Sequence, residues 1–248
     1  MARSAPSVSS PRAATLRRAM DLCDALDRAH PQAECALEHA NAFQLLIATI
    51  LSAQATDVSV NKVTPALFRA YPTAGRLARA TPGEIEPFIR SIGLYRNKAK
   101  NIHGAAKMLV ERFGGEVPRT MEELVQLPGV ARKTANVVLG NCFGINEGFV
   151  VDTHIARLAV RYGFAEPGDT PAAIEKKLMA AFPRERWCKL SHQLIWQGRL
   201  ACKARGGLCR TDPICRAFGV RCELRKEADS PTSKKRGGRA AGKGRPRR

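Results

Sequence analysis

The chain has 248 residues, 44% of them hydrophobic, so it can bury one large core or two smaller ones. Its formal net charge of +19 indicates a polyanionic partner. No apolar run approaches the roughly 18 residues of a membrane span, and the Ser- and Pro-rich N-terminus lacks the apolar region of a secretory signal. We therefore expect no membrane association, a cytoplasmic location, and eight cysteines that are reduced thiols or metal ligands.

The first part of the chain predicts a tail followed by two helices. Residues 1–14 are rich in Ser, Pro and Ala, which predicts disorder. Apolar residues recur at helical spacing over residues 15–29. Residues 43–51 are apolar on every side, which predicts a central buried helix capped by Asn41.

Polar turns end the buried helix and lead into three more helices. Asp57 is expected to cap a helix over residues 58–71, and further helices are expected over residues 81–90 and 95–113. Gln54 lies in the first turn, and its amide can donate and accept; its simplest role is to satisfy a helix end. Leu94 follows a glycine and is either an apolar wedge between DNA base steps or an ordinary core leucine.

Residues 120–142 predict two short helices joined by a Leu-Pro-Gly-Val turn. Thr120 and Glu123 have the spacing of a capping box, and Pro128-Gly129 ends the first helix. Gly129 lets the backbone approach a partner closely. The free N–H groups at the start of the second helix suit a phosphate oxygen. The pattern therefore predicts a helical hairpin that binds phosphate, although it also fits a plain connector.

Lys133 lies in the first turn of the second hairpin helix. The positive end of the helix dipole and the neighbouring Arg132 disfavour an ammonium ion there, which favours a neutral amine. Such an amine is a nucleophile that can form a Schiff base. The alternative is a solvated lysine with no chemical role.

Asp152 follows one helix later, in the run Val-Asp-Thr-His-Ile, and is expected to cap the next helix. A nucleophilic amine and a carboxylate would then both stand at helix starts. Asp152 could equally be a cap and nothing more. The remaining helices are expected over residues 153–162, 171–181 and 185–200, and no sustained strand pattern is found, so the fold class is all-α.

Four cysteines lie close together near the C-terminus with the spacing C-x6-C-x5-C-x6-C: Cys202, Cys209, Cys215 and Cys222. Four thiolates this close suit a [4Fe–4S] cluster or a tetrahedral zinc ion. Residues 223–248 then hold ten Lys or Arg against three Asp or Glu, a net charge of +7. This segment predicts a disordered DNA tether, or else a solubilising tail.

The combined motifs resemble the helix-hairpin-helix DNA glycosylase superfamily, and within it the endonuclease III family. The resemblance rests on Leu-Pro-Gly-Val-Ala-Arg-Lys-Thr at 127–134, Val-Asp-Thr-His-Ile at 151–155, the Gln54 and Leu94 turns, and the cysteines. It covers about residues 15–222. The chain departs from the family pattern at Ala131, where the family has Gly, and at Asp212, which stands where the third cysteine is expected.

The resemblance implies a bifunctional DNA glycosylase and AP lyase of base excision repair that removes oxidised pyrimidines. It implies two helical domains with a cleft between them, a discontinuous one (residues 15–34 and 147–222) and a six-helix one (residues 35–146). Lys133 and Asp152 would be catalytic, and a monomer near the nucleoid would bind damaged double-stranded DNA. The implied DNA contacts are Gln54, Leu94, Gly129, Val130, Ala131, Arg132, Thr134 and His154.

Two other functions remain open at this point. An adenine mismatch glycosylase shares the hairpin, the aspartate and the cysteines, but that family lacks a lysine at position 133. A non-catalytic helix-hairpin-helix protein would use the hairpin for phosphates alone and would need neither Asp152 nor a cleft.

Overall fold

The computed structural model describes residues 11–222, and the regular elements of this range are all helices, as the all-α prediction requires. Predictions for residues 1–10 and for the basic segment 223–248 lie outside the described residues. In chain order the helices are α1 (Pro11–Ala29), α2 (Ala42–Leu51), α3 (Asp57–Ala70), α4 (Ala74–Arg79), α5 (Pro82–Ile89), α6 (Tyr95–Phe113), α7 (Met121–Leu124), α8 (Arg132–Phe143), α9 (Thr153–Arg161), α10 (Pro171–Ala181), the 3₁₀ turn η1 (Arg184–Arg186), α11 (Trp187–Leu200) and α12 (Pro213–Phe218).

Several helix starts differ from the expected ones. Helix α1 begins at Pro11 rather than Thr15, since proline at the first helical position loses no hydrogen bond. Thr56, not Asp57, caps α3 through a bond from the Ser59 amide. Helices α4 and α12 were not predicted because six residues are too few to show an apolar period, although each follows a side-chain cap, Thr73 and Asp212.

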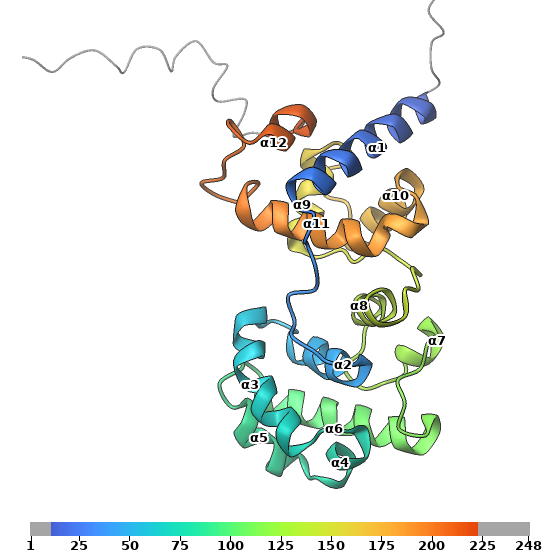
Figure 1. Ribbon diagram of the computed structural model, residues 1–248, viewed down its shortest axis with the longest axis vertical. Coiled ribbons are helices and arrows are strands. Elements are labelled where there is room, and N and C mark those ends of the chain that lie inside the picture. The colour runs from blue at the N-terminus through green and yellow to red at the C-terminus, as the bar shows by residue number, and fades with distance from the viewer. Residues whose placement is uncertain (1–10, 223–248) are drawn as a thin grey trace, which may run out of the picture.

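The apolar side chains form two separate clusters. One is built from α2–α8 and includes Leu45, Leu46 and Ile47 of the largely buried helix α2. The other combines α1 with α9–α12, so the N-terminal helix packs against the C-terminal part of the chain. Figure 1 shows these as two lobes, with α8 at their junction. Seven helices lie between residues 35 and 146, one more than expected, because α4 is present; the exact domain boundaries remain a prediction.

Long-range polar contacts hold the two lobes together around the linker. Arg199 of α11 pairs with Asp57 at the start of α3. His192 of α11 lies 2.8 Å from Asn141 Oδ1 of α8, and Lys189 Nζ donates to the Pro31 carbonyl. Helix α11 therefore forms one wall of the junction. None of the helices described here is both long and apolar enough to cross a membrane.

Candidate functional site

The hairpin turn between α7 and α8 is packed tightly against the rest of its lobe. Gly129 has φ +79°, a conformation that side chains disfavour. A Cβ atom added at Gly129 would lie 3.0 Å from Ile50 Cγ2 and 3.0 Å from Asn101 Cβ. The glycine thus lets the turn lie against α2 and α6. Val130 is buried with the core, so only its backbone is available to a partner.

The N-terminus of α8 is left open. Its N-cap residue is Ala131, with extended backbone (φ −92°, ψ 167°), and within residues 11–222 no side chain caps it. Ala131, Arg132 and Lys133 are exposed, and Thr134 is half-buried. The first amide groups of α8 therefore have no side-chain acceptor and can bind an anion. Alanine at position 131 adopts this cap conformation at a negative φ, so glycine is not required there.

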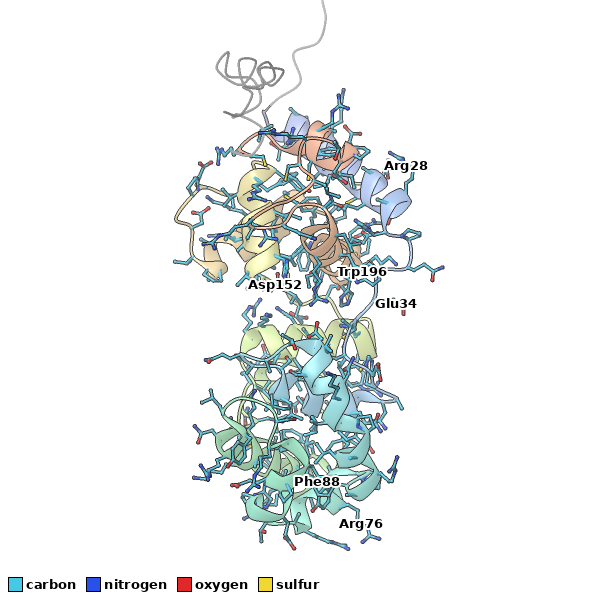
Figure 2. The ribbon with its side chains drawn as sticks, turned by 90° about the vertical axis from the view of Figure 1, so that its left-hand side faces the viewer. Arg28, Glu34, Arg76, Phe88, Asp152 and Trp196 are labelled. Carbon is cyan, nitrogen blue, oxygen red and sulfur yellow. The ribbon has the colours of Figure 1, made fainter. Side chains whose placement is uncertain are left out.

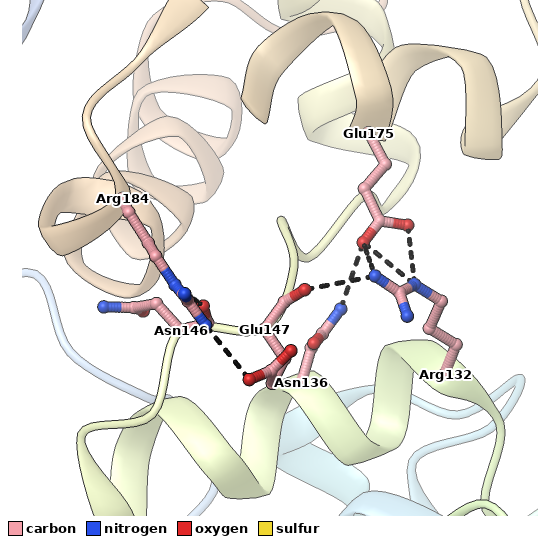
Figure 3. Close-up of polar contacts among 6 residues, drawn as sticks. All are labelled: Arg132, Asn136, Asn146, Glu147, Glu175 and Arg184. Carbon is pink, nitrogen blue, oxygen red and sulfur yellow. Dashed lines mark hydrogen bonds and ion pairs between the residues drawn. The ribbon is translucent and has the colours of Figure 1, made fainter. Parts of the chain in front are cut away.

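Arg132 is engaged within the protein, which its sequence position did not reveal. Its guanidinium pairs with Glu175 of α10 at 3.0 Å and donates to the Glu147 carbonyl at 3.1 Å. Asn136 Nδ2 reaches the same Glu175 carboxylate at 3.3 Å. Figure 3 shows this network beside the contacts of Arg184 with Asn146 and Glu147. Arg132 therefore joins the start of α8 to the other lobe.

Lys133 and Asp152 line the same pocket at the junction of the lobes. The pocket has a volume of about 110 Å³. Its walls come from the linker, the end of α2, the start of α8 and one face of α11, so residues far apart in sequence converge there: Glu34, Cys35, Ala36, Leu37, Thr49, Ser52, Asp57, Lys133, Val137, Val150, Asp152, Ser191, His192, Ile195, Trp196 and Arg199. The amine and the carboxylate of the two sequence candidates thus share one small cavity.

Asp152 is the N-cap of α9, as its sequence context predicts. Its Oδ1 accepts a hydrogen bond from the Ile155 amide at 2.8 Å. This bond holds the carboxyl group in place through Oδ1. The other oxygen, Oδ2, accepts no hydrogen bond from the first amides of α9. Figure 2 places Asp152 on the edge of its lobe that faces the other lobe. The residue is half-buried, so a group entering the pocket can meet the carboxylate.

The pocket also contains residues that the sequence did not single out. His192 lies between the lobes, and burial, with Lys189 nearby, lowers its pKa to about 4. The imidazole is therefore neutral at physiological pH. Trp196 belongs to the same helix and is 39% exposed. The spacing of His192, Trp196 and Arg199 places them on one face of α11, but spacing alone does not reveal which neighbouring helix that face contacts.

Gln54 and Leu94 have an uncommon backbone conformation in common. Within residues 11–222 they are the two non-glycine residues with positive φ, 54° and 59°. Both side chains are exposed, Leu94 by 58%. A left-handed conformation at such residues costs about 1–3 kcal/mol and concentrates at functional sites. Leu94 is therefore not the core leucine of the simpler interpretation.

His154 lies in the first turn of α9, beside the pocket's Asp152. Its Nδ1 is 3.2 Å from Arg157 Nη2, and its ring packs against Gly198, where an added Cβ would lie 2.9 Å from Nδ1. Arg157 also donates to the Gly198 and Cys202 carbonyls. His154 thus connects α9 with α11, and its half-buried ring keeps limited access to solvent.

The C-terminal cysteines form a buried sulfur cluster. The Sγ atoms of Cys202, Cys209 and Cys215 all lie within 4.8 Å of one another and could hold a metal. Cys202 Sγ is 3.8 Å from Cys209 Sγ. Cys222 is also buried, and burial together with the neighbouring Cys202 and Cys222 thiols raises the pKa of Cys209. All four sequence candidates therefore gather in one small loop region.

The surroundings of the sulfurs suit thiolate ligands. Arg161 Nη1 lies 3.2 Å from Cys202 Sγ, and Gln197 Nε2 lies 3.6 Å from Cys215 Sγ. A hydrogen bond with Cys215 and the Arg161 guanidinium lower the pKa of Cys202. Asp212 instead caps α12, accepting from the Cys215 amide at 2.7 Å and from Gln197 at 2.8 Å. The donor set fits a group that binds sulfur, and Cys215 rather than Asp212 lies among the clustered sulfur atoms.

Comparison with known proteins shows which family this chain resembles in sequence and structure. Residues 47–184 match the model of the HhH-GPD superfamily base excision DNA repair proteins. The chain is 52% identical to endonuclease III of Synechocystis sp. over 193 residues, 78% of this chain and 88% of that protein. It is 47% identical to endonuclease III of Bacillus subtilis over 184 residues, 74% and 84% of the two chains. A solved structure of a trapped covalent endonuclease III–DNA intermediate is 43% identical, with a TM-score of 0.79, covering 86% of this chain and 97% of that one.

Proposed function

The chain belongs to the HhH-GPD superfamily of base excision DNA repair proteins, and from this premise we propose that it is a DNA glycosylase with AP lyase activity that removes oxidised pyrimidines. The observation that carries the proposal is the shared pocket of Lys133 and Asp152 at the junction of the lobes. The similarity to a trapped covalent endonuclease III–DNA intermediate supports a covalent mechanism. The proposed substrate is damaged double-stranded DNA, bound by a cytoplasmic, nucleoid-associated monomer.

DNA binding would place the uncapped start of α8 and the two positive-φ residues, Gln54 and Leu94, against the duplex. The phosphate backbone would meet the uncapped amides of α8 around Gly129 and Ala131. The exposed Leu94 would wedge between base steps, and Gln54 would fill the space that a flipped nucleotide leaves. A base inside the stack is unreachable, so the damaged nucleotide would rotate into the pocket.

The chemical step would use the amine and the carboxylate of the pocket. Lys133 Nζ forms a bond to C1′ of the sugar while the C1′–N bond breaks and the base leaves with the electron pair. Asp152 accepts the proton that the amine loses and stabilises the positive charge that develops on the sugar. Opening of the sugar ring gives a Schiff base. Loss of a C2′ proton then breaks the 3′ C–O bond, which cuts the strand.

Borohydride trapping tests this proposal. Wild-type protein and Lys133→Gln are incubated with a duplex containing an oxidised thymine and then reduced. We expect a covalent adduct with wild type and none with Lys133→Gln. Lys107→Gln is the control, since Lys107 is an exposed residue of α6 that pairs with Glu111 at 3.7 Å. An adduct of undiminished yield in Lys133→Gln would overturn the assignment of the nucleophile. Base removal without any adduct and without a strand break would favour a glycosylase that lacks the lyase step.

The two other functions make different predictions in the same assay. An adenine mismatch glycosylase would remove undamaged adenine from a mismatch and spare oxidised pyrimidines. A non-catalytic binding protein would bind the duplex and release no base. Lys133 argues against both, because neither function needs an amine in the pocket.

We further propose that Cys202, Cys209, Cys215 and Cys222 hold a [4Fe–4S] cluster, a structural group that ties the C-terminal loop to the lobe. Four buried thiols with N–H donors around them support it. Zinc is the alternative, because a tetrahedral ion with Zn–S bonds of about 2.3 Å spaces its sulfurs by about 3.8 Å, the distance from Cys202 Sγ to Cys209 Sγ.

Metal and sulfide analysis decides between the two groups. Protein purified without oxygen should contain roughly four iron and four sulfide per chain if the cluster is present. Cys215→Ser should lose most of this content. One zinc and no sulfide would replace the cluster by a single ion and keep the ligands. A full cluster in Cys215→Ser would show that Cys215 is not a ligand.

A further inference from the structure

Trp196 is the one large aromatic side chain among the described residues that line the pocket. It lies on the face of α11 that also carries His192, Ile195 and Arg199, at the helical spacing of neighbours. Figure 2 shows Trp196 on the same edge of its lobe as Asp152. Trp196 is 39% exposed as a residue, although the opposite face of α11 is buried. A large apolar surface thus stays open beside the two proposed catalytic groups.

Most polar side chains of the pocket are already engaged elsewhere. The hydroxyl groups of Thr49, Ser52 and Ser191 each donate to a carbonyl one turn earlier in the chain. Two of the remaining polar residues, His192 and Arg199, are occupied as well: His192 lies against Asn141, and Arg199 is paired with Asp57. Few of these groups remain to read the edge of a base. The exposed indole is the main surface that the pocket offers to a flat ligand.

The size of the pocket limits what can lie against this surface. Its volume of about 110 Å³ is well below the roughly 300 Å³ at which pockets for drug-sized ligands begin. A single pyrimidine ring suits such a space, and base–aromatic stacking is tolerant of the ring's substituents because every base has a π-face.

We propose that Trp196 stacks on the flipped pyrimidine and helps to determine which damaged bases are accepted. The proposal rests on the proposed function, since it names the contact that holds the base while Lys133 attacks the sugar. Stacking requires a flat π-face. A planar oxidised base such as 5-hydroxycytosine therefore depends on Trp196 more than a ring-saturated base such as thymine glycol, whose ring is puckered.

Substitution at Trp196 tests this dependence in single-turnover base removal. Trp196→Ala should lose roughly 5- to 100-fold on 5-hydroxycytosine, as the removal of one base–aromatic stack predicts. The loss on thymine glycol should be several-fold smaller. Trp196→Phe keeps a π-face and should restore most of the rate on the planar base. Leu200→Ala is the matched control, since Leu200 is an exposed residue of α11 outside the pocket.

Fluorescence provides a readout that a purely structural role would not change. The chain has two tryptophans, and the other, Trp187, is buried with its Nε1 donating to the Phe182 carbonyl. In Trp187→Phe, Lys133→Gln the emission comes from Trp196 alone and the base stays attached. A duplex with 5-hydroxycytosine should quench this emission more than the same duplex with an abasic-site analogue.

The outcomes separate this inference from the proposed function. Trapping of wild type on a preformed abasic site tests Lys133 with no base in the pocket. If that trapping succeeds while Trp196→Ala removes both bases at wild-type rates, the stacking role is wrong and the proposed function stands. Equal losses on both bases, without rescue by Trp196→Phe, would also overturn stacking. If wild type forms no adduct, the proposed function fails first.

Discussion

The starts of α8 and α9 stand at the same pocket and are built in opposite ways. Both N-cap residues, Ala131 and Asp152, have extended backbone. Asp152 accepts the Ile155 amide at 2.8 Å, whereas no side chain of the described residues caps α8. An unsatisfied helix start needs an external partner. Helix α9 thus presents its own anion at its start, and in the proposed complex with DNA the open amides of α8 would bind a phosphate.

Removing the charge of Asp152, the cap of α9, should have the largest effect on base removal. Asp152→Asn keeps an oxygen that can accept the Ile155 amide, so the free energy of unfolding should fall by about 1 kcal/mol or less. Single-turnover base removal should fall at least roughly 100-fold, the low end for a general acid or base. Thr170→Ala is the control: it removes the cap of α10 away from the pocket and should lower stability without slowing base removal. Near-normal turnover in folded Asp152→Asn would reduce Asp152 to a cap alone.

Adding a side-chain cap at position 131 should make the start of α8 resemble that of α9. Ala131→Asp adds a cap to an exposed position whose backbone already suits one, so unfolding should become harder by about 1 kcal/mol. The new carboxylate would occupy and repel the phosphate site. DNA affinity should fall roughly tenfold or more, because a charge-assisted hydrogen bond contributes about 1.5–3 kcal/mol. Ala131→Ser adds a neutral cap and should weaken binding less.

Fluorescence anisotropy with an undamaged duplex measures this affinity. A stabilised Ala131→Asp that binds DNA as tightly as wild type would show that the open amides of α8 have no phosphate partner.

The same contrast shows what could be predicted from sequence. Local signals identified the caps Asn41 and Asp152, because a cap and its amide lie within one turn. Helix α6 also spans residues 95–113 as expected. Arg132 could not be interpreted in this way, since its partner Glu175 is 43 residues away. Expected as a DNA contact, Arg132 is seen in the structure joining the lobes, and its role toward DNA remains a prediction.

The pocket itself was the least predictable part. Lys133 and Asp152 were recognisable from their motifs, but His192 and Trp196 belong to a helix with no distinctive pattern. Their position depends on how α11 packs against α8, which no local signal encodes. Helix α12 was missed because its six residues show no apolar period, and because Asp212, which caps it, was considered only as the residue in place of the family's third cysteine.

Leu94 tests whether backbone strain accompanies function at the DNA face. Leu94→Gly removes the cost of the left-handed conformation from a side chain that is 58% exposed, so the free energy of unfolding should rise by about 1 kcal/mol. Base removal from a well-paired lesion should nevertheless fall, because the wedge is lost. Leu94→Ala keeps the strain and should lower activity without the gain in urea stability. A stabilised Leu94→Gly with full activity on paired lesions would remove the wedge role.

His192 should give the smallest effect, on the pH dependence of stability. Burial lowers its pKa from 6.5 to about 4 in the folded protein. The unfolded chain therefore binds more protons between about pH 6.5 and 4, and the stability falls as the pH falls through this window. His192→Gln should flatten that slope in urea unfolding, with His103→Gln as the control. An unchanged slope would show that the imidazole is charged or exposed in solution.

The most direct test of the central claim is to locate the covalent bond. Wild-type protein is reduced with borohydride on an oxidised-thymine duplex, digested, and the modified peptide is sequenced by mass spectrometry. We expect the sugar remnant on Lys133, in the first turn of the uncapped helix α8. A remnant on any other lysine or on the terminal amine would contradict the assignment of this pocket as the catalytic site.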